Sequence, residues 1–291
     1  MNLSRRLLYA SEIWEIARPR TALTAGHLLI RLTNPAIAFD LHSATDWLLC
    51  HNAARHALAH VLGATRCTVL FAHQWHPIGA AIGEPEVESS TPTFHLFGRW
   101  DGETATPGEQ LLLPTQRRVP VAPEKLAAYD DGLRTALRRS AVERAEAQRA
   151  EDERTARARV HFAAVLTDDT AAKCTLDGQA PESVPLTDRP LPGISATPPP
   201  AKAGRHHTVL SPASDGPLAP GHLLAIAAVL QGLTERRGVT GLSCLVPDPG
   251  HGRLEVHVLG RSAGESVNPL DRKSTRLNSS HIQKSRMPSS A

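Results

Sequence analysis

Several features that mark whole classes of proteins are missing from this sequence. Its four cysteines are far apart and form no C-x-x-C pair, which argues against a zinc knuckle and a disulfide scaffold. The longest apolar run, at 223–230, is much shorter than a membrane span. The apolar stretch near the N-terminus is broken at Ser11 and Glu12, too early for a signal peptide. We therefore expect a soluble cytoplasmic protein with no membrane partner. The cysteines are Cys50, Cys67, Cys174 and Cys244.

The familiar catalytic and nucleotide-binding loops are also missing. The chain has no Walker loop, no G-x-G-x-x-G and no G-x-S-x-G. Of its fifteen histidines, His56 and His60 share a helix face, but no H-E-x-x-H accompanies them. His73, His76 and His95 could be drawn together as a zinc site, but their spacing matches no known ligand signature. No metal site is predicted, and the cofactor stays unknown.

The C-terminal tail distorts the charge of the chain. Residues 271–281 read DRKSTRLNSSH and the chain ends SRMPSSA, which resembles a translated sequencing adapter. We treat 271–291 as a non-native tail and leave it out of the fold prediction. The tail holds five of the 32 basic and one of the 29 acidic residues, so the rest has 27 against 28 and a net charge of −1. The charge therefore gives no argument for a nucleic-acid partner.

Hydrophobic periodicity predicts two similar sets of elements. The first set has strands at 26–32, 67–73 and 93–100 and a helix at 40–62, followed by a helix from Pro123 whose apolar stripe ends near residue 137. The second set has strands at 159–167, 206–212, 241–248 and 253–261 and a helix at 221–237. Residues 184–204 are too rich in proline for regular structure.

One short pattern occurs in both sets. TFHLFGRW at 93–100 and EVHVLGRS at 255–262 share a histidine, then two apolar residues, then Gly-Arg. The loops between the elements differ in length, as expected for a duplicated domain. We predict an N-terminal half at 1–137, a charged helical linker at 138–158 and a C-terminal half at 159–270 that contains the proline-rich insert.

The strings TAGHLLI, HVLGAT and TPTFHLFGRWDGE resemble the HIT superfamily, the histidine-triad nucleotide hydrolases and transferases. The resemblance covers most of 7–137 and, more weakly, 159–265. Two such halves in one chain are similar to the galactose-1-phosphate uridylyltransferase and diadenosine tetraphosphate phosphorylase families. The resemblance implies an α+β fold in which two HIT-like halves, each an antiparallel sheet with helices, form an intrachain pseudo-dimer. It also implies that the chain is a monomer, since the second half replaces the partner subunit.

In this family, three alternate histidines project from one strand face toward a phosphate, and the middle one attacks the α-phosphorus. Aligned on Gly98, the first copy offers Thr91, Thr93 and His95. The second copy, aligned on its own Gly-Arg, offers only one histidine and places glutamate at the nucleophile position. Its three residues are Arg253, Glu255 and His257.

The resemblance therefore yields candidate residues in two roles. The catalytic candidates are Thr93, His95, Glu255 and His257. The phosphate-binding candidates are Thr91, Arg99, Arg253 and Arg261. His95 could serve as a base for Thr93, and Glu255 could act as a nucleophile or share a metal with His257. His27 matches a strand position whose role is structural.

Three functions remain open at this point. The leading one is a nucleotide- or phosphate-binding protein of nucleotidyltransferase or hydrolase descent, with a degenerate triad and impaired or altered catalysis. The second is an active nucleotidyltransferase or phosphohydrolase with a non-histidine nucleophile. The third is a structural or interaction protein on the same scaffold. The first two imply a small-molecule nucleotide or phosphate ester as partner.

Overall fold

A computed structural model describes residues 6–74, 85–86, 92–168, 193–199, 206–213, 218–235, 239–248 and 254–261. The chain divides into two compact units, one of residues 1–137 with 191–291 and one of residues 138–190. The helix α4 (Pro123–Asp168) begins in the first unit and continues into the second.

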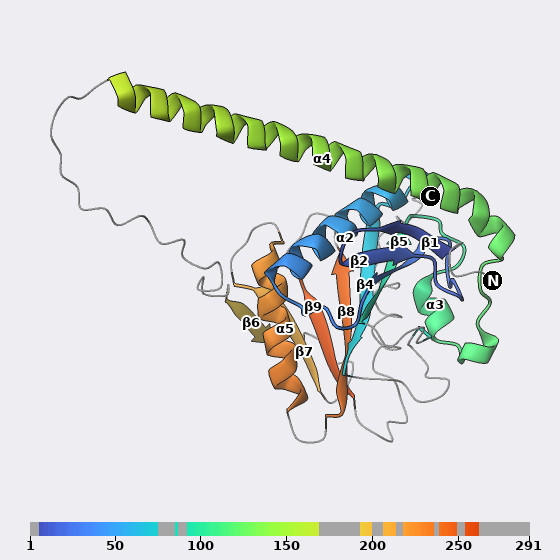
Figure 1. The fold of residues 1–291 in the computed structure, drawn as a ribbon. Helices are drawn as coiled ribbons and strands as arrows, with labels where there is room; N and C mark the ends of the chain where they lie inside the picture. The colour runs from blue at the N-terminus through green and yellow to red at the C-terminus, as the bar shows by residue number, and fades with distance from the viewer. Residues whose placement is uncertain are drawn as a thin grey trace, which may run out of the picture. The chain divides into compact units, whose positions relative to one another are not determined.

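The first unit is built on one nine-stranded antiparallel sheet with the order β1-β2-β3-β5-β4-β8-β9-β7-β6 (Figure 1). Helices and an antiparallel sheet in one unit confirm the predicted α+β class. The strands are β1 (Leu7–Ala10), β2 (Trp14–Ala17), β3 (His27–Leu32), β4 (Arg66–His73), β5 (Thr93–Arg99), β6 (Ile194–Thr197), β7 (His207–Pro212), β8 (Gly241–Asp248) and β9 (Val256–Arg261). The described helices of this unit, besides the start of α4, are α2 (Leu41–Leu62), α3 (Pro107–Leu111), the short η1 (Thr115–Arg117) and α5 (Pro220–Thr234).

Local sequence sets the ends of α2. The Asp40 carboxylate accepts from the backbone N–H of Ser43, and the Ser43 hydroxyl accepts from the backbone N–H of Asp40, a capping box that satisfies two unpaired donors. The helix ends at Gly63, whose φ of 67° suits glycine best. The predicted helix at 40–62 is therefore confirmed to within one residue.

Helices α2 and α5 pack on the same face of the sheet. Side chains alternate along each strand, so Leu28, Ile30 and Leu96 face α2 and share a buried cluster with Leu58 of that helix. The start of α4 adds Leu133 and Leu137 to this cluster. In the other half, Leu210, Leu242 and Val258 form a cluster with Ile226 and Leu230 of α5. The opposite face of the sheet carries the histidines.

The strand pairing is symmetric about the centre of the sheet. Leu70 of β4 lies directly opposite Leu245 of β8, and each is also paired with a histidine, His95 on β5 or His257 on β9. Moving outward, Leu29 of β3 pairs with His95 and Val209 of β7 pairs with His257. The registers on the two sides of the Leu70–Leu245 pair thus correspond.

The same backbone hydrogen bonds recur in both halves. The N–H of Gly98 donates to the carbonyl of Gly26 at 2.9 Å, and the N–H of Gly260 donates to that of His206 at 2.8 Å. Strands β5 and β9, which carry the repeated His-x-x-Gly-Arg pattern, therefore occupy equivalent positions. This equivalence extends to the outer strands, since β2 lies beside β3 as β6 lies beside β7.

Two predicted segments differ from the structure. Residues 159–167, predicted as a strand, belong to α4, because the helix-favouring run of Ala, Arg and Glu before them continues the helix and no strand of the sheet pairs with them. The predicted irregular insert at 184–204 contains β6, which forms the outer edge beside β7. Its four residues lie between prolines and pair on one side only, where proline neighbours are tolerated. Strands β1 and β2 were not predicted, because each is only four residues long.

The charged part of α4 is helical, as predicted for 138–158. Its described side chains are mostly exposed, and ion pairs one turn apart join Arg139 to Glu143 at 3.8 Å and Arg154 to Glu151 at 3.5 Å. Such pairs add only about 0.2–0.5 kcal/mol each to a helix. None of the described helices is both long and apolar enough to cross a bilayer.

Gly26→Ala is expected to destabilise the first unit. A Cβ at Gly26 would lie 2.8 Å from the carbonyl oxygen of Gly98, and strand backbone cannot yield easily, so the overpacking should cost about 1–3 kcal/mol. Gly232→Ala in α5 is the matched control, since a Cβ there meets nothing within 4 Å and alanine favours a helix by about 1 kcal/mol. Urea denaturation measures both changes. Equal unfolding midpoints for the two variants would contradict the close approach of Gly26 to β5.

Candidate histidine-pair pocket

The first histidine pair joins two neighbouring strands. His27 on β3 and His95 on β5 point to the same face, and His27 Nε2 lies 3.1 Å from His95 Nδ1. His27 is fully buried and stacks on Phe97, with ring centroids 4.2 Å apart. His95 is only partly buried. The pair therefore has an inner ring held by packing and an outer ring near the surface.

The hydrogen bonds of this pair define its tautomers. The backbone N–H of Leu23 donates to His27 Nδ1 at 3.3 Å, so a neutral His27 carries its proton on Nε2. That N–H then donates to Nδ1 of His95, which leaves the proton of a neutral His95 on its own Nε2. The chain of hydrogen bonds runs outward and ends in an N–H donor.

Both imidazoles are held in the neutral form. Burial lowers the pKa of His95 to about 4. The pKa of His27 is lowered well below its usual value, first by burial and then by the nearby His95 and the Arg18 cation. At neutral pH neither ring carries a charge, so the tautomers above apply.

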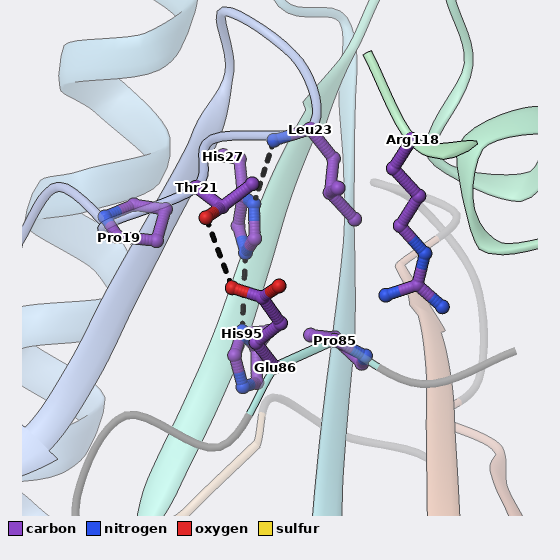
Figure 2. A pocket seen from close by; sticks show the side chains of 8 residues that line it. All are labelled: Pro19, Thr21, Leu23, His27, Pro85, Glu86, His95 and Arg118. Carbon is purple, nitrogen blue, oxygen red and sulfur yellow. Dashed lines mark hydrogen bonds between the residues drawn. The ribbon is translucent and has the colours of Figure 1, made fainter. Parts of the chain in front are cut away.

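A small pocket opens beside this pair (Figure 2). It holds about 250 Å³ including its open mouth. The Thr21 hydroxyl donates to the Glu86 carboxylate at 2.9 Å across its rim, and Arg118 approaches from the other side. Arg118 is buried, and its Nε donates to the carbonyl of Leu113 at 3.0 Å. The lining residues are Pro19, Thr21, Leu23, His27, Pro85, Glu86, His95 and Arg118.

A second histidine pair occupies the equivalent place in the other half. His207 Nε2 on β7 lies 3.2 Å from His257 Nδ1 on β9, and both rings are buried. His257 Nε2 is 3.9 Å from Glu255 Oε2, whose side chain is 52% exposed. The two pairs therefore share their geometry but differ in surroundings, since the first borders a pocket and the second is enclosed.

The predicted site residues fall in different places. Thr93 lies on the same face of β5 as His95, two residues before it, but does not line the pocket. Arg99 is ion-paired with Glu103, four residues on, and Arg261 donates to the Ser243 hydroxyl at 3.2 Å in the buried part of the second half. Thr91 and Arg253 lie outside the described residues, as does His76.

The sequence missed the pairing partner of each histidine and the pocket arginine. His27 and His207 lie 68 and 50 residues from their partners, so only the alignment of β3 with β5 and of β7 with β9 reveals the pairs. Arg118 follows η1 in a short basic run without periodicity. Within the described part of the chain, no three His, Cys, Asp or Glu side chains are grouped to hold a metal ion.

No family model and no curated protein sequence matches this chain. Solved structures similar to it include a Hit-like protein involved in cell-cycle regulation from Bartonella henselae, with 16% identity, 45% of this chain and 85% of that chain covered, and a TM-score of 0.31. A zinc-bound histidine triad family protein from Mycobacterium smegmatis shares 14% identity over 46% of this chain and 84% of its own, with a TM-score of 0.32. A histidine triad nucleotide-binding protein from Sulfolobus tokodaii shares 13% identity over 46% and 84%, with a TM-score of 0.33. The likeness covers about half of this chain, and at these TM-scores it establishes neither membership of a family nor a function.

The stability of the protein is expected to depend on His95 below neutral pH. In the unfolded chain its pKa returns from about 4 toward 6.5, so between these values the unfolded chain binds more protons than the native one. The free energy of unfolding therefore falls as the pH is lowered through this window, by up to about 1.4 kcal/mol per pH unit for each such histidine. Urea denaturation of wild type and His95→Asn at pH 7, 6 and 5 should show a shallower pH dependence in the variant.

His56→Asn is the control for that experiment, because His56 is exposed on α2. Its pH dependence should match that of wild type. If His95→Asn and wild type lose stability equally between pH 7 and 5, His95 is not held neutral in the native protein.

Proposed function

We propose that this protein binds a phosphate group of a nucleotide or small phosphate ester in the pocket beside His27 and His95. The observation that carries the proposal is the direction of the hydrogen-bond chain, which leaves His95 with an N–H donor on the side of the ring away from His27 (Figure 2). Phosphate oxygens accept hydrogen bonds, so an outward N–H suits them and suits a cation poorly.

Two further pocket side chains support an anion, and one opposes it. Arg118 supplies a guanidinium group, which binds phosphate oxygens by paired donors, and the Thr21 hydroxyl adds a neutral polar group at the rim. Glu86 adds a carboxylate to the same rim, so an arriving phosphate competes with it for these donors. The volume of about 250 Å³ includes open solvent at the mouth, so a phosphate group would bind at the mouth of the pocket with the rest of the molecule outside.

The pocket favours binding over the histidine chemistry of the HIT superfamily. The position of the nucleophile is Thr93, which does not line the pocket. A threonine hydroxyl needs a base to take its proton, and in the tautomer described above His95 has no free ring nitrogen to accept one. We therefore propose a binding protein of nucleotidyltransferase or hydrolase descent whose triad is degenerate and whose catalysis is impaired or altered.

We further propose that the two halves are HIT-like copies that form a pseudo-dimer within one monomer. This proposal is supported by the matched registers, the paired Gly98 and Gly260 hydrogen bonds and the repeated histidine pair. A two-fold interface brings the same surface of each copy together, as β4 and β8 do about the Leu70–Leu245 pair.

A phosphate-dependent thermal shift tests the binding proposal. The full chain should show a saturable rise in Tm with inorganic phosphate, AMP and ADP but not with adenosine. A ligand at a hundred times its Kd adds about 2.7 kcal/mol to the free energy of unfolding. His95→Ala and Arg118→Gln should each remove the shift while the proteins stay folded. No shift with any phosphate compound would overturn the proposal.

His257→Ala decides which histidine pair binds. This variant removes the equivalent ring of the second pair, which is buried and does not line the pocket. It should lower Tm without removing the phosphate shift. Loss of the shift in His257→Ala but not in His95→Ala would place the ligand in the second half.

A second candidate function rests on Glu255. Its carboxylate stands at the nucleophile position of the second copy, with Oε2 at 3.9 Å from His257 Nε2. Such a carboxylate can attack the α-phosphorus of a nucleoside diphosphate ester and form an acyl phosphate, while the bond from that phosphorus to the bridging oxygen breaks and the β-phosphate part leaves. Water then hydrolyses the acyl phosphate and releases the carboxylate. In that case the protein turns over a nucleoside diphosphate ester, and Glu255→Gln abolishes the turnover without affecting folding. Turnover that persists in Glu255→Gln would exclude this residue as the nucleophile.

A further inference from the structure

A buried arginine stands behind the first histidine pair. Arg18 directly follows β2 and is 3% exposed. Its Nη1 donates to the carbonyls of Ala25 and His27 at 2.7 and 2.8 Å. Its Nε and Nη2 donate to the Asp130 carboxylate on α4 at 3.0 and 2.7 Å. One guanidinium group thus joins the turn before His27 to the first part of α4.

These hydrogen bonds hold the turn that carries His27. The His27 N–H donates to the carbonyl of Thr24 at 3.1 Å, and the carbonyl of Gly26 accepts from the N–H of Gly98 at 2.9 Å. Arg18 binds the carbonyls on either side of Gly26. The backbone of residues 24–27 is therefore held by β5 on one side and by Arg18 on the other, and the ring of His27 has little freedom to change its partners.

A gain in stability alone does not account for the buried ion pair between Arg18 and Asp130. Desolvation of two charges offsets much of their attraction, and apolar residues of similar size often serve stability as well or better. The guanidinium fork, by contrast, gives donors in fixed directions that apolar side chains lack. The geometry therefore fits a role in orientation.

The second half has no arginine at the corresponding position. By the register of β2 with β3 and of β6 with β7, Arg18 corresponds to Pro198, which is exposed. There both rings of the histidine pair are buried and held by packing. In the first half His27 is fully buried, but His95 is only partly buried and borders an open pocket, so packing holds the outer ring of this pair less tightly.

We propose that Arg18, ion-paired with Asp130, is a positioning residue for the histidine-pair pocket. It holds the 24–27 turn so that His27 keeps its Nε2 proton on His95 and His95 presents an N–H to the pocket. The Arg18 cation also lowers the pKa of His27, after the larger effect of burial, and so opposes protonation of the pair. The consequence for phosphate affinity rests on the proposed function, whereas the tautomers of the two rings do not.

The test reads the imidazole rings directly. Two-bond ¹⁵N–¹H spectra of the full chain without ligand should show both His27 and His95 of wild type as neutral Nε2–H tautomers. Arg18→Lys keeps a positive charge but loses the fork, and Asp130→Asn keeps the arginine but removes its counter-charge. Both variants should show mixed tautomers for His27 and His95. Phosphate affinity should fall about tenfold to a hundredfold, as when a partner that orients a metal-binding histidine is removed.

Arg31→Gln is the matched control. Arg31 is likewise ion-paired with an acidic residue, Glu15, and is partly buried, but it does not line the pocket. It should lower Tm and leave the imidazole spectra unchanged. If Arg18 has a purely structural role, Arg18→Lys should also lower Tm and leave the imidazole spectra unchanged. That outcome overturns the proposal.

The remaining outcomes separate the two proposals. If the tautomers change in the variants but wild type binds no phosphate, the positioning role stands and the proposed function fails. If wild type binds phosphate and folded Arg18→Lys and Asp130→Asn keep both the wild-type tautomers and the wild-type affinity, the positioning role fails alone. If neither variant folds, Arg18 serves the fold itself, and the positioning role is overturned.

Discussion

The antiparallel pairing of β4 with β8 is the contact on which the rest of the sheet depends. Each half of the sheet, taken alone, would expose β4 or β8 as a strand edge, and exposed edges invite uncontrolled pairing. Joining them places Leu70 against Leu245 at the centre and satisfies both edges within one chain. The buried side chains around this pair include Phe97 and Leu259, which are themselves equivalent residues of β5 and β9. This central register sets how the two histidine pairs lie relative to each other, while the pairing of β3 with β5 and of β7 with β9 forms each pair.

Symmetry of the backbone does not make the two halves alike in chemistry. Each half brings a histidine from its inner strand against one from the neighbouring strand, at 3.1 and 3.2 Å. In the first half Arg118 and the Thr21 hydroxyl line a pocket beside the pair. In the second half the pair is enclosed, and the acidic Glu255 stands where the first half has Thr93. The two halves thus share their strand pairing while the polar groups around the two histidine pairs differ.

A neutral imidazole can act as a base, a nucleophile or a donor, and its hydrogen-bond partner decides which. At His95 the partner is an N–H of His27, which in turn is set by the backbone N–H of Leu23. The outer nitrogen is thereby a donor. A donor at this place fits the phosphate-binding function proposed above. The buried Arg18 and its partner Asp130 extend the same chain of constraints inward to α4.

The sequence by itself determined most of the local elements and showed one short pattern that occurs twice. The capping residues Asp40 and Gly63 mark the ends of α2, the alternation around His95 and His257 predicts β5 and β9, and the repeated Gly-Arg relates the halves, because all of these depend on neighbours a few residues apart. Short strands such as β1, β2 and β6 escaped prediction, since four residues carry too little periodicity. The strand predicted at 159–167 was wrong because local pattern does not say whether a partner strand is available. Only the tertiary structure decided that His27 meets His95, that Arg118 lines the pocket and that Arg18 binds Asp130, 112 residues away in the sequence. Such contacts are set by the sheet register and by burial, and both act between residues that are distant in the chain.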